Sequence, residues 1–570
     1  MPFEILRWLE KQGLAALVAR QKWLAMPAGR RLIRPKEITF ADDSGLLESR
    51  TNRRGALLLS LEAETYPDFQ LGDIFVSSDT IVDLFQHFER YYLVHAPFMQ
   101  PVGSLDRLAS ASPLLFWTIA LITCQHHEKH HELYSRLLAP HQELMVPLST
   151  RAIRSIGEVH ALLLLCMWPL PKRQALLDPT WSYVGIAVNT CMKMNFHNPL
   201  PPGHAAQGFG LWSGSPGDIT PQSQSLTWMA MFQGVLPPLA SSHHLRYVRK
   251  ALEHLGSLVP TEFQASIFMY EIVCKYSVSL EEVDDIAVQF SFIQAFDSSL
   301  DAIKQTYRAQ WTPELDIQLQ CSKLNLYAMT ALLPPREAAE MEVQDRVNIQ
   351  SILHRGLESS SRIISQMKEL SLLPFENGLS NGGRLTSYPR LYSADMFFAA
   401  TYLFRSLLDR RLLSPTHVAR AVESLVEARK LFTQMPRHRD GAMAGEILEK
   451  IVDKARSAGI GSGLLSSTQL CITNRLGASL MHDTLFHIHQ AARQKPYLTS
   501  TPADQVQAAG VHPPLPDTIT PTADVQFQAV DIQSIPLNTS LGEDPGEGFW
   551  PWLDASINDM VADLDQQIFM

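Results

Sequence analysis

The sequence predicts an all-α fold, in which one large multi-helix domain lies between a disordered N-terminal linker and a disordered acidic C-terminal tail. Apolar residues recur at spacings of three and four through most of residues 75–495, which is the period of helices with one buried face. Few segments show the two-residue alternation of strands. After Lys495 the chain turns polar and rich in Pro and Thr, so it has too little apolar surface to offset the entropy of ordering.

Residues 1–74 are expected to contain a helix, a basic stretch and a linker. Residues 1–28 have an amphipathic helical pattern, and residues 38–74 have the mixed composition of a linker. Between them, residues 20–36 contain no acid. The basic residues at the end of this stretch are Arg30, Arg31, Arg34 and Lys36. Such a cluster can act as a nuclear-import signal or basic linker, or it can be a solvated surface.

Residues 75–495 are expected to form consecutive helices with two mobile loops. Helix-start pairs of Ser with Asp or Pro occur at Ser78, Ser112 and Ser414. Pro-, Gly- and Ser-rich composition predicts the loops near 198–225 and 377–393. The periodicity predicts helices at 113–138, 286–308, 314–331, 343–370, 394–408, 415–434, 445–457 and 476–493.

Residues 155–199 predict a buried helical hairpin. Pro169 and Pro171 end its first helix, and Asp178-Pro179 begins the second, with Asp as N-cap and Pro at the first helical position. The expected buried residues of the first helix are Ile153, Ile156, His160, Leu163, Leu164 and Met167. Those of the second helix are Trp181, Val184, Ala187, Val188, Cys191 and Met194.

The residues of this hairpin suggest a family. The elements LLLLCMWPLP and DPTWSYVGIAV, followed by a helix running into FHNP, resemble the middle homology region of fungal zinc-cluster transcription factors. Two segments depart from that pattern: residues 195–198 replace a Gly-Leu-His-Arg ending, and residues 227–244 lack the Asp-Arg pair of the next family helix. The resemblance covers about residues 75–495 and implies an all-α regulatory domain that senses a ligand or is autoinhibitory.

The six cysteines do not have the spacing of that family's zinc cluster. A zinc cluster needs close C-x2-C pairs because several thiolates must converge on each metal, and even the nearest pair here, Cys166 and Cys191, is far apart in sequence. Buried free thiols are expected instead. We therefore expect no cofactor in this chain, with zinc only if a cluster exists upstream of Met1. Contact with DNA would be indirect or made through that missing N-terminal module.

Charge is divided unevenly along the chain. Its 48 Lys and Arg and 58 Asp and Glu give a net charge of −10, but no Lys or Arg follows Lys495, so the body is close to neutral and the tail is acidic. A neutral body is not the footprint of a strong nucleic-acid binder. The longest apolar runs fall short of the roughly 20 residues of a membrane span, so no membrane partner is expected.

The tail, residues 496–570, ends in a candidate activation segment at 542–570. This segment mixes acids with large apolar side chains, which is typical of disordered activation segments. The acids keep the apolar groups solvated until one face can fold as a helix in a hydrophobic groove of a partner. The residues expected to bind coactivators are Phe549, Trp550, Trp552, Leu553, Ile557, Met560, Leu564 and Phe569. A helix that folds back onto the body is the alternative.

Residues 127–131 match H-E-x-x-H, the zinc-protease pattern in which two His one helical turn apart bind zinc and Glu activates water. The match lies in a polar run, HHEKHHE, and no third ligand follows at a suitable spacing. A solvated helix is the expectation, and a zinc hydrolase built on His127, Glu128 and His131 is an alternative.

The stripe Asp395–Phe404 is expected to be core, with an effector pocket lined by its aromatic and Met side chains as the alternative.

Together these features predict a non-enzymatic transcriptional regulator in the nucleus, acting as an activator of a fungal pathway or gene cluster. The tail would recruit coactivators, and the helical body would regulate. Pairing with a second copy of the chain or with a complete zinc-cluster factor is left open. A helical scaffold or adaptor without a role in transcription is the alternative from another class.

Overall fold

The computed structural model describes most of the chain between residues 67 and 435 and a few positions beyond. The described residues are 67–99, 102–153, 155–171, 178–196, 221–234, 242–256, 259–281, 283, 285–330, 343–373, 383–408, 413–435 and scattered positions between 444 and 484. They are almost entirely helical, which confirms the all-α prediction. The expected N-terminal helix and basic stretch and the acidic tail lie outside the described residues.

A β-hairpin opens the described part of the chain. Its antiparallel strands are β1 (Phe69–Leu71) and β2 (Ile74–Val76). Gly72 in the connecting turn has a φ of +56°, a conformation that favours glycine. The rings of Phe69 and Phe116 lie 4.9 Å apart, so the hairpin packs on the helices that follow. The hairpin crosses the expected boundary after residue 74, and the linker prediction is therefore wrong for residues 67–74.

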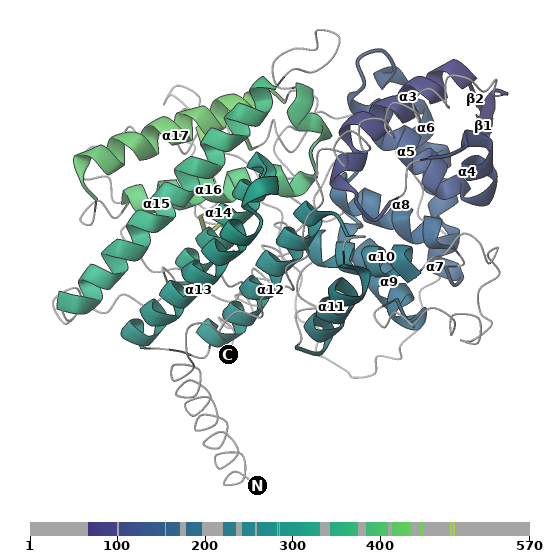
Figure 1. Cartoon of the computed structure of the whole chain (residues 1–570). Helices are drawn as coiled ribbons and strands as arrows, with labels where there is room; N and C mark the ends of the chain where they lie inside the picture. Colours follow the sequence, from purple (N-terminus) through teal and green to yellow (C-terminus); the bar gives the residue numbers. More distant parts are fainter. Residues whose placement is uncertain are drawn as a thin grey trace, which may run out of the picture. The chain divides into compact units, whose positions relative to one another are not determined.

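The first group of helices packs around α5 (Figure 1). Its members are α3 (Ser78–Tyr91), η2 (Leu93–His95), α4 (Leu105–Ala111), α5 (Pro113–His126), α6 (His131–Met145), α7 (Pro147–Thr150), α8 (Ile156–Met167) and α9 (Thr180–Lys193). Every residue of α5 from Leu114 to Cys124 is buried, because this helix is apolar on all sides and α3, α4, α6 and α8 contact it. No single described helix is both long and apolar enough to cross a membrane; α4 and α5 meet that criterion only as a pair bent by 118°.

Helices α8 and α9 form the predicted hairpin. Ser155 caps α8, since its hydroxyl accepts a hydrogen bond from the Glu158 amide at 3.2 Å. The four middle positions of the predicted α9 stripe are buried, namely Val184, Ala187, Val188 and Cys191. Trp181 in the first turn is 55% exposed, so the prediction of burial is wrong there: the buried stripe begins one turn into the helix.

The second group consists of long helices that lie side by side (Figure 1). Its members are α12 (Thr261–Glu281), α13 (Ile286–Thr306), η6 (Arg308–Gln310), α14 (Pro313–Thr330), α15 (Val343–Leu372), η7 (Gly383–Ser387), α16 (Arg390–Leu408) and α17 (Pro415–Thr433). Between the two groups in sequence are α10 (Pro221–Gly234) and α11 (Ser242–Leu255). Helix α10 contacts α8 and α9 of the first group as well as α12 of the second, so it connects the two groups.

Polar contacts also join the groups around η7 and the start of α16. The Trp168 indole donates to the Ser387 carbonyl at 3.0 Å, and the Arg390 guanidinium pairs with the buried Asp178 carboxylate at 3.0 Å. Both contacts fall in the segment expected as a loop at 377–393. That prediction is wrong for residues 383–393, because their tyrosines are buried and helix α16 begins at Arg390.

The prediction of the other loop also extends into a helix. Helix α10 begins at Pro221, so the loop prediction at 198–225 is wrong for its last five residues, and residues 198–220 lie outside the described part. Residues 113–138 form two helices, α5 and α6, where one was expected.

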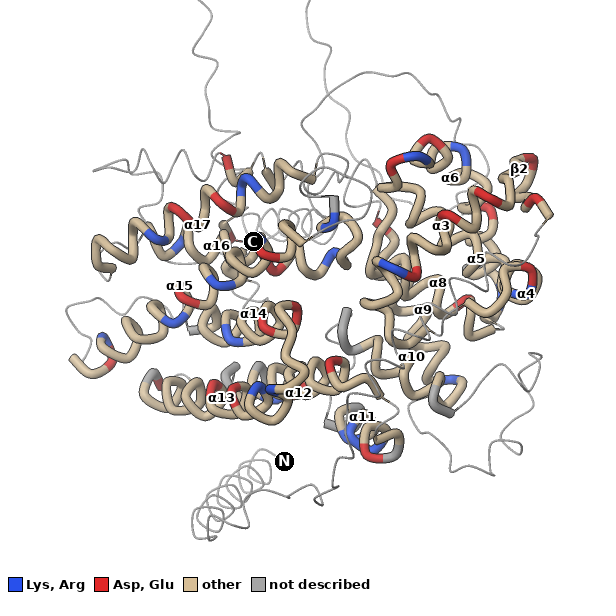
Figure 2. Tube along the Cα trace, turned by 45° about the horizontal axis from the view of Figure 1, so that its top comes forward, with Lys and Arg blue, Asp and Glu red and all other residues tan. Residues whose placement is uncertain are grey.

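Figure 2 shows acids and bases interspersed along the described helices, which agrees with the near-neutral charge of residues 1–495.

Candidate functional site

The residues predicted to contact coactivators and the import machinery lie outside the described part of the chain. This applies to the activation residues between Phe549 and Phe569 and to the basic stretch from Arg30 to Lys36. Their roles stay predictions from sequence. The candidate sites that the structure does describe are the H-E-x-x-H match, the aromatic stripe of α16 and one pocket.

The H-E-x-x-H match is not one helical turn. Helix α5 ends at His126, His127 has extended backbone angles (φ −71°, ψ 134°), and α6 begins at His131. The exposed His131 ring contacts the Glu128 carbonyl at 3.1 Å. The solvated-helix expectation and the helical zinc-hydrolase geometry are therefore both wrong here. The physical reason is that the polar run HHEKHHE lacks apolar residues that would hold a continuous helix against the core.

The aromatic stripe of α16 is core, as expected. Residues from Met396 to Phe404 are buried in one cluster with side chains of α14, α15 and α17. Asp395 at the start of the stripe accepts a hydrogen bond from the Cys321 thiol at 2.9 Å. Burial raises the pKa of Asp395 to about 7. The stripe does not contribute to the lining of the pocket described below, and the effector-pocket alternative at these residues stays a prediction.

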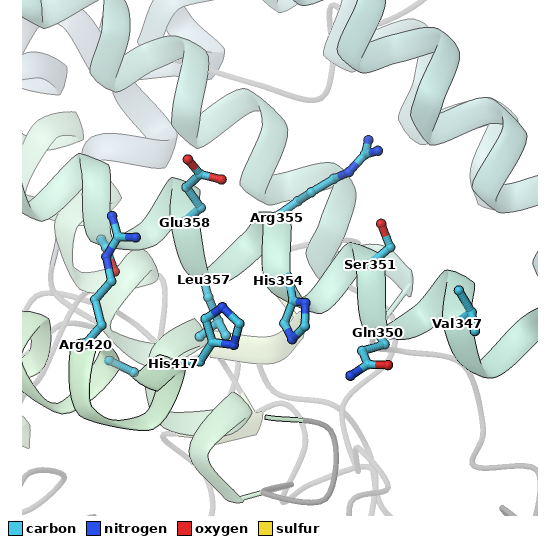
Figure 3. A pocket seen from close by; sticks show the side chains of 11 residues that line it. Val347, Gln350, Ser351, His354, Arg355, Leu357, Glu358, His417 and Arg420 are labelled. Carbon is cyan, nitrogen blue, oxygen red and sulfur yellow. The ribbon is translucent and has the colours of Figure 1, made fainter. Parts of the chain in front are cut away.

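A pocket of about 480 Å³ opens instead between α15 and α17 (Figure 3). Its volume is in the usual range of small-molecule sites. Helix α15 contributes residues three or four apart, which places them on one face. They are Val347, Gln350, Ser351, His354, Arg355, Leu357, Glu358 and Ser361. Helix α17 contributes His417, Arg420 and Ala421.

Two histidines, one from each helix, contact each other at this pocket. The rings of His354 and His417 lie 4.3 Å apart, and Figure 3 shows them side by side. His417 is held by the start of its own helix: Ser414 is the N-cap, its hydroxyl accepts from the His417 amide at 3.3 Å, and it bonds to the His417 Nδ1 at 2.8 Å. The Ser-Pro capping signal at residue 414 therefore also positions a pocket residue.

The charged side chains of the pocket differ in whether they form an ion pair within the protein. The Arg355 guanidinium donates to the Asp297 carboxylate of α13 at 2.8 Å and points away from the histidines in Figure 3. Glu358 and Arg420 are exposed and extend on the same side of the pocket (Figure 3). Within the described residues, Arg420 makes no ion pair, so its guanidinium is available for a ligand oxygen.

This lining suits a small polar molecule that offers both hydrogen-bond donors and acceptors. Buried Leu357 and Ala421 and the exposed Val347 supply a limited apolar surface, while the remaining groups are imidazole, hydroxyl, amide, guanidinium and carboxylate. Sequence reasoning missed the pocket. Its stripe of polar residues on α15 is visible at helical spacing, but nothing local pairs His354 with a residue on another helix.

Comparisons with known proteins find relatives among fungal transcription factors. The transcriptional regulatory protein SEF1 of Candida albicans is 22% identical over 466 residues, which are 76% of this chain and 47% of that protein. The putative transcription factor SEF1 of Eremothecium gossypii is 34% identical over 131 residues, or 23% of this chain and 12% of that protein. The regulatory protein LEU3 of Saccharomyces cerevisiae is 25% identical over 142 residues, or 22% and 16%.

The match therefore spans about half of the Candida protein and much smaller parts of the other two. No family model matches the chain. No solved structure matches it either. The relatives agree with the resemblance that the α8–α9 hairpin suggested, because all three are fungal and are named for regulation or transcription.

Proposed function

We propose that this chain is a transcriptional regulator that activates a fungal pathway or gene cluster in the nucleus. The observation that carries the proposal is its similarity over 466 residues to the transcriptional regulatory protein SEF1 of Candida albicans. This similarity extends over three quarters of the chain, well beyond a single motif. The all-α body with interspersed charges supports regulation through protein or small-molecule contacts. DNA contact comes through a partner factor or a module outside this chain.

The activating function belongs to the tail. Residues 542–570 combine acids with Trp550, Trp552 and Leu553, a mixture that suits docking in a hydrophobic coactivator groove. Residues 535–570, fused to an unrelated DNA-binding domain, are expected to raise transcription of a reporter gene several-fold. Replacing the three apolar residues by Ala should return the reporter to background.

A matched control separates side-chain chemistry from the number of substitutions. Ser556, Asn558 and Gln566 lie in the same segment, and their replacement by Ala should leave activation unchanged. No activation by the wild-type segment, or full activation by the variant without Trp550, Trp552 and Leu553, would remove the support for an activator. A helical adaptor without transcriptional function would give the first of these results.

The pocket between α15 and α17 supplies the regulatory input. Its volume and polar lining support binding of a small polar metabolite, with Arg420 and His354 as the anchoring groups. Thermal unfolding of the full chain with amino acids, hydroxy acids and sugar phosphates as probes tests this role. At least one probe class should stabilise the wild type and the exposed control Arg246→Ala but not Arg420→Ala. The absence of any stabilising probe, or equal stabilisation of Arg420→Ala, would count against the pocket.

A further inference from the structure

The break between α5 and α6 brings two histidines against an acid of α3. Asp83 lies on α3, and His127 and His130 lie in the turn that joins α5 to α6. The His130 Nε2 is 2.9 Å from the Asp83 Oδ2, and the His127 Nε2 is 3.9 Å from the same oxygen. The two imidazole rings stack with their centroids 4.7 Å apart.

These side chains have the geometry of metal ligands. One ligand atom from each of the three residues lies within 4.8 Å of the other two. In a tetrahedral zinc site with metal–ligand bonds of about 2.05 Å, neighbouring ligand atoms are about 3.3 Å apart. The observed separations of 2.9 and 3.9 Å from the shared oxygen lie on either side of that value, so small rotations of the side chains would close the site.

We propose that Asp83, His127 and His130 bind a divalent transition-metal ion such as Zn²⁺ and thereby fasten the α5–α6 turn to α3. Two imidazoles and one carboxylate are the donor set of many zinc sites. His127 is buried while the other two ligands are half-buried, which gives the ion both a low-dielectric environment and access from solvent. The site is independent of the transcriptional role proposed above.

Binding of an ion requires two changes in the surroundings of the cluster, both at Lys129. His87 lies one helical turn after Asp83 on α3, and its ring packs edge-on against His127 with centroids 4.8 Å apart. The three ligands leave the fourth coordination position of a tetrahedral ion to water. The Lys129 amide donates to the His127 Nδ1 at 3.3 Å, a long bond that is lost when His127 binds through Nε2 and carries its proton on Nδ1. The exposed Lys129 ammonium, 3.9 Å from Asp83, can move into solvent.

Adjacent histidines give a matched test, because the H-E-x-x-H pattern would use His131 where the proposed site uses His130. Untagged full-length chain, stripped with a chelator, would be dialysed against Zn²⁺ and its metal content measured. The wild type and His131→Ala should hold one more zinc per chain than Asp83→Asn or His130→Ala. Saturating Zn²⁺ should raise the unfolding temperature of the first two proteins by about 3 °C and leave the other two unchanged.

The outcomes separate this site from its alternatives. His130→Asn keeps a hydrogen-bonding side chain beside Asp83 without an imidazole, so it serves if His130→Ala fails to fold. Equal zinc content in the wild type and both His130 variants would overturn the proposal and assign the metal to adventitious cysteine or histidine sites. Loss of zinc in His131→Ala with retention in His130→Ala would overturn it in favour of the H-E-x-x-H pair.

Discussion

Replacing Gly356 by alanine tests the close packing of α15 against α16. Gly356 lies on the buried face of α15, and a Cβ placed there would overlap the Tyr402 hydroxyl and ring and would stand 2.5 Å from its Cε1. Carbon atoms in van der Waals contact are about 3.5–4.0 Å apart, so the overlap is at least about 1 Å. Tyr402 is 1% exposed within the core cluster, so neighbouring side chains surround its ring.

The expected cost follows from two opposing terms. Forcing a methyl group into a packed core costs about 1–3 kcal/mol, and a rigid buried ring puts this site at the upper end. Alanine recovers about 1 kcal/mol of helix propensity relative to glycine. The net expectation is a loss of about 2 kcal/mol in the free energy of unfolding. Because Arg355 and Leu357 on either side line the pocket, the same change should also weaken ligand-dependent stabilisation.

Gly185 in α9 is the matched control. No atom lies within 4 Å of a Cβ built there, so Gly185→Ala has only the propensity term and should stabilise the protein by up to about 1 kcal/mol. Urea unfolding followed by tryptophan fluorescence would compare the two variants with the wild type. If Gly356→Ala were as stable as Gly185→Ala, the close approach of α15 to Tyr402 would be refuted.

Three further changes test other contacts. Since burial raises the pKa of Asp395 to about 7 from 3.8, the folded state retains a proton that the unfolded state loses, and stability should fall between those pH values. Urea unfolding should show the wild-type free energy of unfolding falling by about 4 kcal/mol between pH 4 and pH 7.5. Asp395→Asn should remove most of this fall, and an unchanged fall in the variant would contradict the raised pKa of Asp395. Arg390→Met should cost about 3 kcal/mol by removing the ion-pair partner of the buried Asp178 carboxylate. Adding Asp178→Asn should recover part of that loss, and additive losses would argue against the pair. Trp168→Phe should cost about 1 kcal/mol through the lost bond to the Ser387 carbonyl, and a neutral result in thermal unfolding would show that this bond contributes little.

Local signals predicted the long helices well. Helices α13, α14, α15 and α17 begin and end within two residues of the expected bounds, because periodicity and start signals such as Ser414-Pro415 act over one or two turns. The start of α16 was missed by four residues. Its first turn contains Tyr392, which is buried among side chains of the second group of helices, and no local sequence pattern predicts that contact.

The candidate sites depended on contacts that the sequence does not encode locally. His354 and His417 meet only because α15 and α17 pack together, and Asp83 meets His130 only because the helix breaks after His126. The polar run around His130 is compatible with a helix or a turn, and tertiary packing decides between them. The same run matches the zinc-protease motif through its composition of His and Glu, although its backbone is not one helical turn.

If this chain regulates transcription, it is present at the promoters of its target genes, and chromatin immunoprecipitation of the tagged full-length chain in its own cells measures this. The proposal predicts enrichment at discrete promoters above an untagged strain, with reduced transcription of the adjacent genes when Trp550, Trp552 and Leu553 are replaced by Ala. A tagged chain that is present in cell extracts but enriched at no promoter would contradict the assignment of this protein as a transcriptional regulator.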